Sequence, residues 1–274
     1  MYDNFILLIQ NGQTNEFIEF ADKQNMDFLR SEKDENGWIL LHHAAEHGAI
    51  DIMKFLIEKG CDVNAKSNTG YTPLYIAIET GMFSTDMARL LITHGAEVGS
   101  SLHKAVLLND IQLVKEALSE TADINKKDNF GNTALHHAVA IQNSEIVNLL
   151  LTYQADIDCY DNYLTTPLHA VCADNATDLI SLVLEAQPDL EAEDYNGRTA
   201  IIFAAGNAFK EGVLLLLKKK VNIDHQDNFG NTALHYAFEN SEIEIAQLLI
   251  QAGADTTLLN EDGHQPFDLL PSEV

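Results

Sequence analysis

The chain has 274 residues, in which 16 Lys and Arg stand against 42 Asp and Glu, and 46% of the residues are hydrophobic. This composition is that of a globular protein and excludes intrinsic disorder. The formal net charge of -26 disfavours nucleic acid and anionic membranes as partners and predicts a basic or neutral protein partner. A single core rarely grows beyond roughly 250–300 residues, so we expect either two domains or an extended repeat array.

The cysteines and the apolar runs predict a cytoplasmic chain. Cys61, Cys159 and Cys172 are odd in number and far apart, so they cannot form a disulfide framework. The start, MYDNFILLIQNGQ, lacks the basic segment and the long apolar run of a signal peptide. No later apolar run is long enough to cross a bilayer.

Residues 1–33 are predicted to form a degenerate pair of helices that caps the N-terminal end of the following array. After them one short segment recurs: DNFGNTALHHAV at 128–139 returns almost unchanged as DNFGNTALHYAF at 227–238, an offset of 99 residues or three times 33. Related segments begin at residues 34, 67, 161 and 194, so the period is 33 residues. The one exception is the step from Thr72 to Ser100, which is 28 residues.

Each 33-residue unit contains signals for two helices and a loop. Thr133 precedes an apolar run with small residues, which is typical of an N-cap followed by a short, closely packed helix. Ser144 then precedes an acidic first turn and apolar residues at helical spacing, which predicts a second helix. Glycines such as Gly60 and Gly253 end several second helices, and the extended stretch after them is predicted to be a hairpin.

The TPLH-like tetrapeptides and the 33-residue period resemble those of ankyrin repeats over residues 34–274. The resemblance implies an all-α repeat solenoid of stacked helix pairs with β-hairpin fingers, and we expect it to be monomeric. It also implies a truncated C-terminal capping repeat at 260–274. The seven predicted repeats are 34–66, 67–94, 95–127, 128–160, 161–193, 194–226 and 227–259. The short step predicts that the finger near 95–99 is lost, which would be a bend, an entry point for a partner or a tolerated deletion.

The eleven histidines do not indicate catalysis or a metal. Those in the fourth place of the tetrapeptide, for which the resemblance implies structural hydrogen bonds to the Thr and the backbone, are His42, His103, His136, His169 and His235. Adjacent histidines on a helix diverge by about 100° and would not converge on one ion. No phosphate-binding loop, nucleophile elbow or zinc-protease motif occurs, so we expect a non-catalytic protein without a cofactor or metal.

The resemblance implies that a protein partner binds along a concave face formed by the finger tips and the exposed ends of the first helices. Exposed aromatic residues at regular spacing favour an interface, although they could instead fold back on the next hairpin. Leu107, Leu108 and Ile141 add an apolar centre between acidic outer units. The predicted partner-binding residues at the tips are Trp38, Tyr71, Phe130, Tyr163, Tyr195, Arg198 and Phe229.

We therefore predict a protein–protein interaction module, which the sequence does not distinguish from a scaffold for several partners. One alternative is a secreted effector or adaptor of an intracellular organism, delivered into a host cell to act on host proteins. Another is a substrate of asparaginyl hydroxylation at Asn64, because Leu56, Asp62, Val63 and Asn64 resemble the hairpin pattern that such a hydroxylase modifies.

Overall fold

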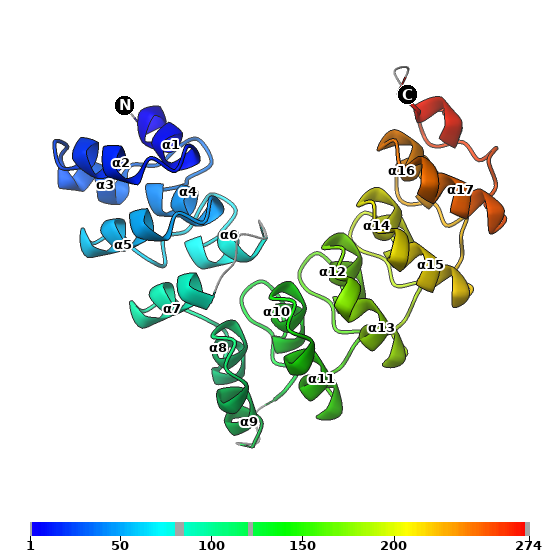
Figure 1. The fold of residues 1–274 in the computed structure, drawn as a ribbon, viewed down its shortest axis with the longest axis horizontal. Coiled ribbons are helices and arrows are strands. Elements are labelled where there is room, and N and C mark those ends of the chain that lie inside the picture. Colours follow the sequence, from blue (N-terminus) through cyan, green and yellow to red (C-terminus); the bar gives the residue numbers. More distant parts are fainter. Residues whose placement is uncertain (1, 80–84, 120–122, 272–274) are drawn as a thin grey trace. The chain divides into compact units, whose positions relative to one another are not determined.

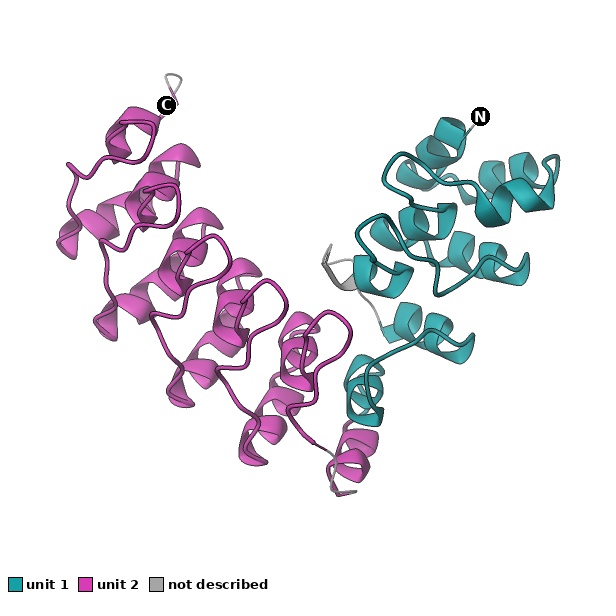
Figure 2. Cartoon of the chain, turned by 180° about the vertical axis from the view of Figure 1, so that it is seen from behind, with its two compact units in different colours: residues 1–110 teal, residues 111–274 magenta. Residues whose placement is uncertain are grey.

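A computed structural model describes residues 2–79, 85–119 and 123–271 of the chain (Figure 1). These residues contain seventeen α-helices, one 3-10 helix and no strand. They fall into two compact units, unit 1 at residues 1–110 and unit 2 at residues 111–274 (Figure 2).

The helices of each unit are short and closely spaced. Unit 1 contains α1 (Tyr2–Gln10), α2 (Thr14–Ala21), α3 (Met26–Ser31), α4 (Leu40–Glu46), α5 (Ile50–Glu58), α6 (Pro73–Glu79), α7 (Thr85–Thr93) and α8 (Ser101–Leu107). Unit 2 contains α9 (Ile111–Ser119), α10 (Ala134–Ala140), α11 (Ser144–Thr152), α12 (Pro167–Ala173), α13 (Thr177–Glu185), α14 (Ala200–Gly206), α15 (Lys210–Lys218), α16 (Ala233–Glu239), α17 (Ile243–Gln251) and the 3-10 helix η1 (Pro266–Leu269).

In each unit the first helices of consecutive repeats stack on one another, and so do the second helices, as a helical repeat solenoid requires (Figure 1). In unit 2 the first helices α10, α12, α14 and α16 form one layer, and the second helices α11, α13, α15 and α17 form the other. Unit 1 repeats this arrangement, with α4 against α6 and α5 against α7. The predicted all-α repeat architecture is therefore confirmed.

The spacing of small and large residues explains the two layers. Ala138, Ala204 and Ala237 occupy equivalent places on first helices and are 0% exposed, so these helices approach one another closely. Leucines of the second helices, such as Leu150 and Leu216, are also 0% exposed and fill the space between the layers. Each repeat therefore buries its core only against its neighbours.

The predicted β-hairpin fingers are not resolved as strands, because the described loops contain turns and no strand. Each loop is closed by very few backbone bonds of its own: the N–H of Asp128 donates to Asn132 O at 2.9 Å, and the N–H of Gly131 donates to Asp128 O at 3.1 Å. These bonds form a single turn and not a ladder. We call the five residues of each such turn a tip loop, here 128–132.

Two connections differ from the regular pattern. Residues 2–31 contain three helices and not only a pair, since the short α3 follows α1 and α2. Its N-cap is Asn25, whose Oδ1 accepts from Asp27 N at 2.9 Å. Between α7 and α8 the chain has only residues 94–100, half the length of the connection 153–166 between α11 and α12.

Histidines of the first helices join consecutive repeats. The N–H of Thr133 donates to His136 Nδ1 at 3.2 Å, so this nitrogen is the acceptor and Nε2 carries the proton. Nε2 lies 3.1 Å from Thr165 O of the next repeat, to which it donates. Equivalent contacts from His42, His169 and His235 reach the carbonyls of Tyr71, Arg198 and His264. These imidazoles are therefore structural and neutral in the fold.

In one repeat that lacks this histidine, the cap hydroxyl is orphaned. Ile202 stands in the histidine place, and Oγ1 of the fully buried Thr199 has no hydrogen-bond partner among the described residues. In the repeat of Thr133, by contrast, Oγ1 lies 2.9 Å from His136 Nδ1. A buried hydroxyl without a partner destabilises the fold.

We expect the same substitution to have opposite effects at these two positions. Thr133→Val removes a buried hydrogen bond and should lower the free energy of unfolding by about 1–2 kcal/mol. Thr199→Val removes only the orphaned hydroxyl and should leave that free energy unchanged or raise it by up to about 1 kcal/mol. Urea unfolding followed by circular dichroism measures both, and an equal loss in the two variants would contradict the assignment.

Candidate functional site

The tip loops of unit 2 are held in shape by their first residue, which is an aspartate in four of the five. Asp161 shows the pattern, because its Oδ1 accepts from the N–H groups of Tyr163 and Thr165, both at 2.8 Å. A single carboxylate oxygen thus replaces the missing backbone partners of the turn. The tip loops of unit 2 are 128–132, 161–165, 194–198, 227–231 and 260–264.

Neighbouring tip loops are bonded to one another through their backbones. Phe130 O accepts from Asn162 N at 3.0 Å, and Tyr163 O accepts from Tyr195 N at 2.9 Å. Phe229 O accepts from Glu261 N at 2.9 Å. The aromatic residues of the loops are therefore fixed one repeat apart along one edge of the unit.

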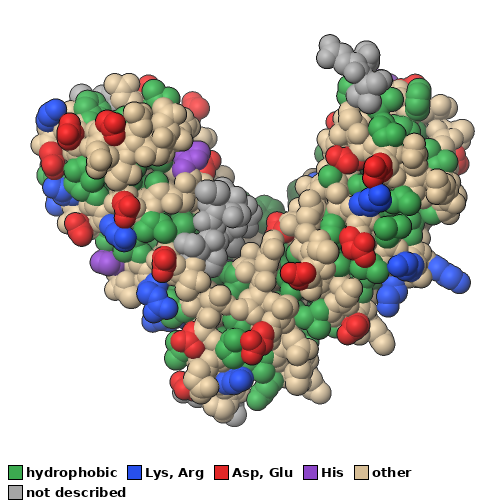
Figure 3. Space-filling view, in the orientation of Figure 1, with side chains coloured by type: hydrophobic (Ala, Val, Ile, Leu, Met, Phe, Trp, Pro, Cys, Tyr) green, Lys and Arg blue, Asp and Glu red, His purple; other side chains and the backbone are tan. Residues whose placement is uncertain are grey.

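Three of the predicted tip aromatics of unit 2 are well exposed. The exposed fractions are 46% for Tyr163, 74% for Tyr195 and 53% for Phe229. Phe130 is half-buried. The space-filling view shows hydrophobic side chains interspersed with acidic ones over this unit (Figure 3). Exposed rings on a braced backbone are suited to bury area against a partner without losing much conformational entropy.

The two predicted tip aromatics of unit 1 lie differently. Trp38 stacks on His42 of its own first helix with ring centroids 5.9 Å apart, and it is half-buried. Tyr71 stacks on Tyr75 at 4.6 Å. Both follow the loop glycine, whose positive φ turns the chain back toward its own helix, whereas Phe130 and Phe229 precede it. The fold-back that the sequence left open thus occurs within one repeat for Trp38 and Tyr71.

The predicted apolar centre is only partly at the surface. Leu107 is 1% exposed and belongs to the core, so its assignment to the partner-binding surface was wrong. Leu108 and Ile141 are half-buried, and they are the C-cap residues of α8 and α10. A residue in the last helical turn is buried wherever neighbouring elements approach it, and the repeat register does not reveal that.

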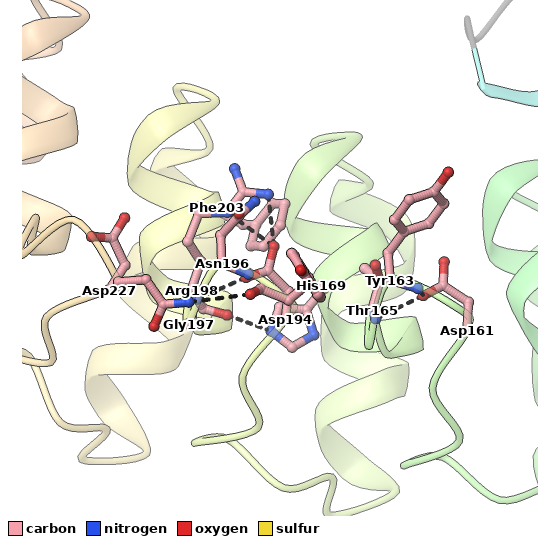
Figure 4. A network of polar contacts seen from close by, with 12 residues as sticks. Asp161, Tyr163, Thr165, His169, Asp194, Asn196, Gly197, Arg198, Phe203 and Asp227 are labelled. Atoms are coloured by element: carbon pink, nitrogen blue, oxygen red, sulfur yellow. Dashed lines mark hydrogen bonds and ion pairs between the residues drawn. The ribbon is translucent and has the colours of Figure 1, made fainter. Parts of the chain in front are cut away.

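Arg198 lies at a pocket of unit 2. Its Nε and Nη2 both donate to Asp194 Oδ2, at 3.0 and 2.7 Å, and its guanidinium lies 4.3 Å from the centroid of the Phe203 ring (Figure 4). The pocket has a volume of about 170 Å³ and lies between α14 and α16. It is lined by Arg198, Ile202, Phe203, Gly206, Asn207, Tyr236 and Asn240.

The aromatic lining of this pocket was not predicted from the sequence. Phe203 and Tyr236 occupy the place nine residues after the tip-loop aspartate, at the middle of a first helix, where Ala170 stands in the preceding repeat. Variation at one place of an otherwise regular repeat was the signal that could have identified them. Tyr236 is also tied to its loop, since its hydroxyl donates to Asp227 Oδ2 at 2.7 Å.

Asn64 has a structural role in unit 1. Its Nδ2 donates to Gly95 O at 2.9 Å, and its Oδ1 accepts from Glu97 N at 2.8 Å. In unit 2 the equivalent Asn125 accepts from Asp156 N at 2.9 Å. The side chain therefore links consecutive repeats, and its hydroxylation stays a prediction.

In the described parts of the chain, no three His, Cys, Asp or Glu side chains come together in a way that could hold a metal ion. No helix in residues 2–79, 85–119 and 123–271 has the length and apolar character needed to cross a membrane. Burial raises the pKa of the Cys61 thiol to about 11 and that of Cys172 to about 12, so neither thiol is activated as a nucleophile.

Several known proteins are similar to parts of this chain. A putative ankyrin repeat protein of Rickettsia felis is 33% identical over 107 residues, which is 36% of this chain and 47% of the relative. Protein phosphatase 1 regulatory subunit 27 of Mus musculus is 35% identical over 85 residues, 31% of this chain and 51% of the relative. A transient receptor potential cation channel subfamily A member 1 homolog of Caenorhabditis elegans is 30% identical over 131 residues, 46% of this chain and 10% of the relative. The chain spans about half or less of the length of these relatives.

The sequence also matches a family described as Ankyrin repeats (3 copies), over residues 5–101, 102–194 and 170–260. Ankyrin repeats generally mediate contacts between proteins and are generally not catalytic. Because the three matches cover residues 5–260 without a break, the chain belongs to the ankyrin-repeat family.

Proposed function

We propose that this chain is a non-catalytic binding module and that the tip loops of unit 2, together with the pocket at Arg198, bind a protein partner. The observation that carries the proposal is the exposure of aromatic rings on loops that are hydrogen-bonded to one another. Tyr195 and Phe229 are 74% and 53% exposed, and they lie on consecutive tip loops. Rings of this kind dominate the binding energy of protein interfaces.

The surroundings of these rings favour a basic or neutral partner. Arg198 is the only Lys or Arg in the four segments 128–141, 161–174, 194–207 and 227–240, which hold the tip loops and first helices, and Asp194 pairs with it. The acidic residues in the same segments are Asp128, Asp161, Asp174, Asp194, Asp227 and Glu239. A negative field around the rings attracts cationic chains and repels anionic ones.

A phage-displayed library of random 12-residue peptides, panned on the immobilised chain, tests this surface. Peptides selected on the unaltered chain should bind the double variant Tyr195→Ala, Phe229→Ala at least about ten-fold more weakly, because each ring buries area at the centre of the contact. Tyr153→Ala is the matched control, since Tyr153 is 51% exposed but ends α11, away from the tip loops. Fluorescence polarisation of the labelled peptides gives the affinities.

The comparison of the two variants decides the proposal. Unchanged binding to the double variant, with the melting curve also unchanged, would remove the tip loops of unit 2 as the binding surface. An equal loss in the Tyr153 control would show that the peptides recognise exposed aromatic residues in general. Either result would leave the fold assignment intact and require another surface.

We also retain three finer predictions as proposals. The chain acts in the cytoplasm, alternatively after delivery into a host cell, and it acts as an acidic adaptor. It is monomeric and binds neither nucleic acid nor membranes.

Hydroxylation of Asn64 would add 16 Da to the peptide that contains this residue, and mass spectrometry of the natively expressed chain would detect it. A wholly unmodified peptide would contradict this proposal.

A further inference from the structure

Five tip loops begin with an aspartate, namely Asp34 in unit 1 and Asp128, Asp161, Asp194 and Asp227 in unit 2. In four of these loops the second carboxylate oxygen, Oδ2, has a side-chain partner. His43 Nε2 lies 3.1 Å from Asp34 Oδ2, and His137 Nε2 lies 2.9 Å from Asp128 Oδ2. The Tyr236 hydroxyl and the Arg198 guanidinium bind Asp227 and Asp194 in the same way. Each aspartate therefore uses one oxygen for its loop and the other for a donor of the same repeat.

Asp161 is the exception. Its Oδ1 holds the loop as in the other repeats, but no donor of the described residues reaches its Oδ2 (Figure 4). The place that holds His43, His137 and Tyr236 in other repeats is occupied by Ala170, and the place of Arg198 is occupied by Thr165. Both possible internal partners are thus absent from one repeat.

Asp161 is also partly accessible to solvent. Asp161 and Ala170 are both half-buried, whereas His43 and His137 are 7% and 4% exposed in the repeats that have the imidazole. Replacement of a ring by a methyl group leaves room beside the carboxylate. Tyr163, on the same tip loop, is 46% exposed.

We propose that an arginine side chain of the protein partner fills the space beside Ala170 and pairs with Asp161 Oδ2. The inference rests on the proposed function of the tip loops and names the chemical group that they recognise. The groups that occupy this place in other repeats are planar donors, which a guanidinium reproduces. Arg198 is an example of this contact within the chain, because its guanidinium pairs with the tip-loop aspartate Asp194 and lies over an aromatic ring.

Charge also favours an arginine over an anionic or neutral side chain. The formal net charge is -26, and the cations nearby already have partners in the chain: Asp194 binds Arg198, and Lys127 Nζ donates to Tyr160 O at 2.6 Å. A half-buried carboxylate with one oxygen unused gains more from a cationic donor than a fully exposed one does. The incoming guanidinium would complete the pattern of the other four repeats.

Two substitutions remove the proposed contact and preserve the loop. Asp161→Asn keeps an oxygen for the loop N–H groups, as Asn260 does at the equivalent place, where its Oδ1 accepts from His264 N at 2.9 Å. Ala170→His places an imidazole where His137 stands in the preceding repeat, so it closes the space from within. Asp178→Asn, at an exposed aspartate in the first turn of α13, is the control for the loss of one negative charge.

The probes are the peptides selected on the unaltered chain, each synthesised with arginine and with citrulline, its neutral analogue of the same shape. The arginine peptides should bind Asp161→Asn and Ala170→His about five- to ten-fold more weakly than the unaltered chain, and they should bind Asp178→Asn equally well. The citrulline peptides should bind the unaltered chain and Asp161→Asn equally. Fluorescence polarisation at one fixed ionic strength measures these affinities.

Two results would overturn the inference. One is a selection that yields peptides without arginine, and the other is an arginine-to-citrulline affinity ratio that is the same for the unaltered chain and for Asp161→Asn. Both results are compatible with the proposed function as long as the double variant at Tyr195 and Phe229 still loses the peptides. If that variant keeps them, the proposed function fails first.

Discussion

Lowering the pH from 7 to 4 is expected to reduce the stability of the chain by several kcal/mol. Burial lowers the pKa of His136 to about 4, against 6.5 in an unfolded chain, and neighbouring carboxylates and the bond to Thr165 O only partly oppose it. The unfolded chain therefore takes up a proton between pH 6.5 and 4 that the folded chain does not. The stabilisation is complete above pH 6.5 and is lost as the pH falls toward 4.

His136 alone accounts for about 3 kcal/mol of this change, because its pKa is displaced by roughly 2.5 units at 1.36 kcal/mol each. Burial also lowers the pKa values of His42, His169 and His235, so their contributions have the same sign. In the fold, His136 Nδ1 accepts a hydrogen bond from the N–H of the cap residue Thr133. Protonation would place a second N–H at Nδ1, so that two donors would face each other.

Urea unfolding at pH 7, 6, 5 and 4 measures this dependence. His136→Gln should reduce the slope of the free energy of unfolding against pH between 6 and 4 by up to about 1.4 kcal/mol per pH unit, the value for one proton. The control is the same substitution at the exposed His94, which should leave the slope at that of the unaltered chain. A free energy of unfolding that does not change between pH 6.5 and 4 would contradict the neutral assignment of these histidines.

The fold was predictable from the sequence because its information is local and repeated. Thr133, His136 and Ala138 recur at 33-residue intervals in most repeats, and each place in the repeat has one physical role in capping, bonding or packing. The bonding of the tip loops was not predicted, because Asp161 and its equivalents look like ordinary solvated residues of a hairpin. Only the structure shows that one carboxylate oxygen replaces a ladder of backbone bonds.

The candidate site was predictable only in part, because the sequence does not show in which direction a side chain points or which groups lie next to it. The sequence places an aromatic residue at six of the tips, but it does not show whether the ring folds back on its own helix or is exposed. Tyr71 follows Gly70 and stacks on Tyr75, whereas Phe229 precedes Gly230 and is exposed. The missing donor to Asp161 Oδ2 becomes evident only when this oxygen is compared with Oδ2 of the aspartates at the same place in the other repeats.

The contact between tip loops connects stability with the proposed binding surface. Gly131 has φ +83°, and a Cβ there would lie 2.6 Å from Asn162 N and 2.9 Å from the carbonyl carbon of Asp161. Asn162 N is the group that donates to Phe130 O at 3.0 Å. A side chain at residue 131 would therefore push away the loop that carries Asp161 and Tyr163.

Gly131→Ala is accordingly expected to lower the free energy of unfolding by roughly 3–4 kcal/mol, of which about 1–2 kcal/mol is the cost of positive φ and the rest the displaced loop. Gly70→Ala is the matched control, because Gly70 has the same place in its loop and φ +87°, but no heavy atom within 4 Å of the added Cβ among the described residues. It should cost only about 1–2 kcal/mol. Urea unfolding measures both variants, and amide hydrogen exchange at Asn162 should show lost protection in Gly131→Ala alone. Equal costs in the two variants would mean that the loops yield without resistance, and tip-loop aromatics on such loops would not be pre-positioned for a partner.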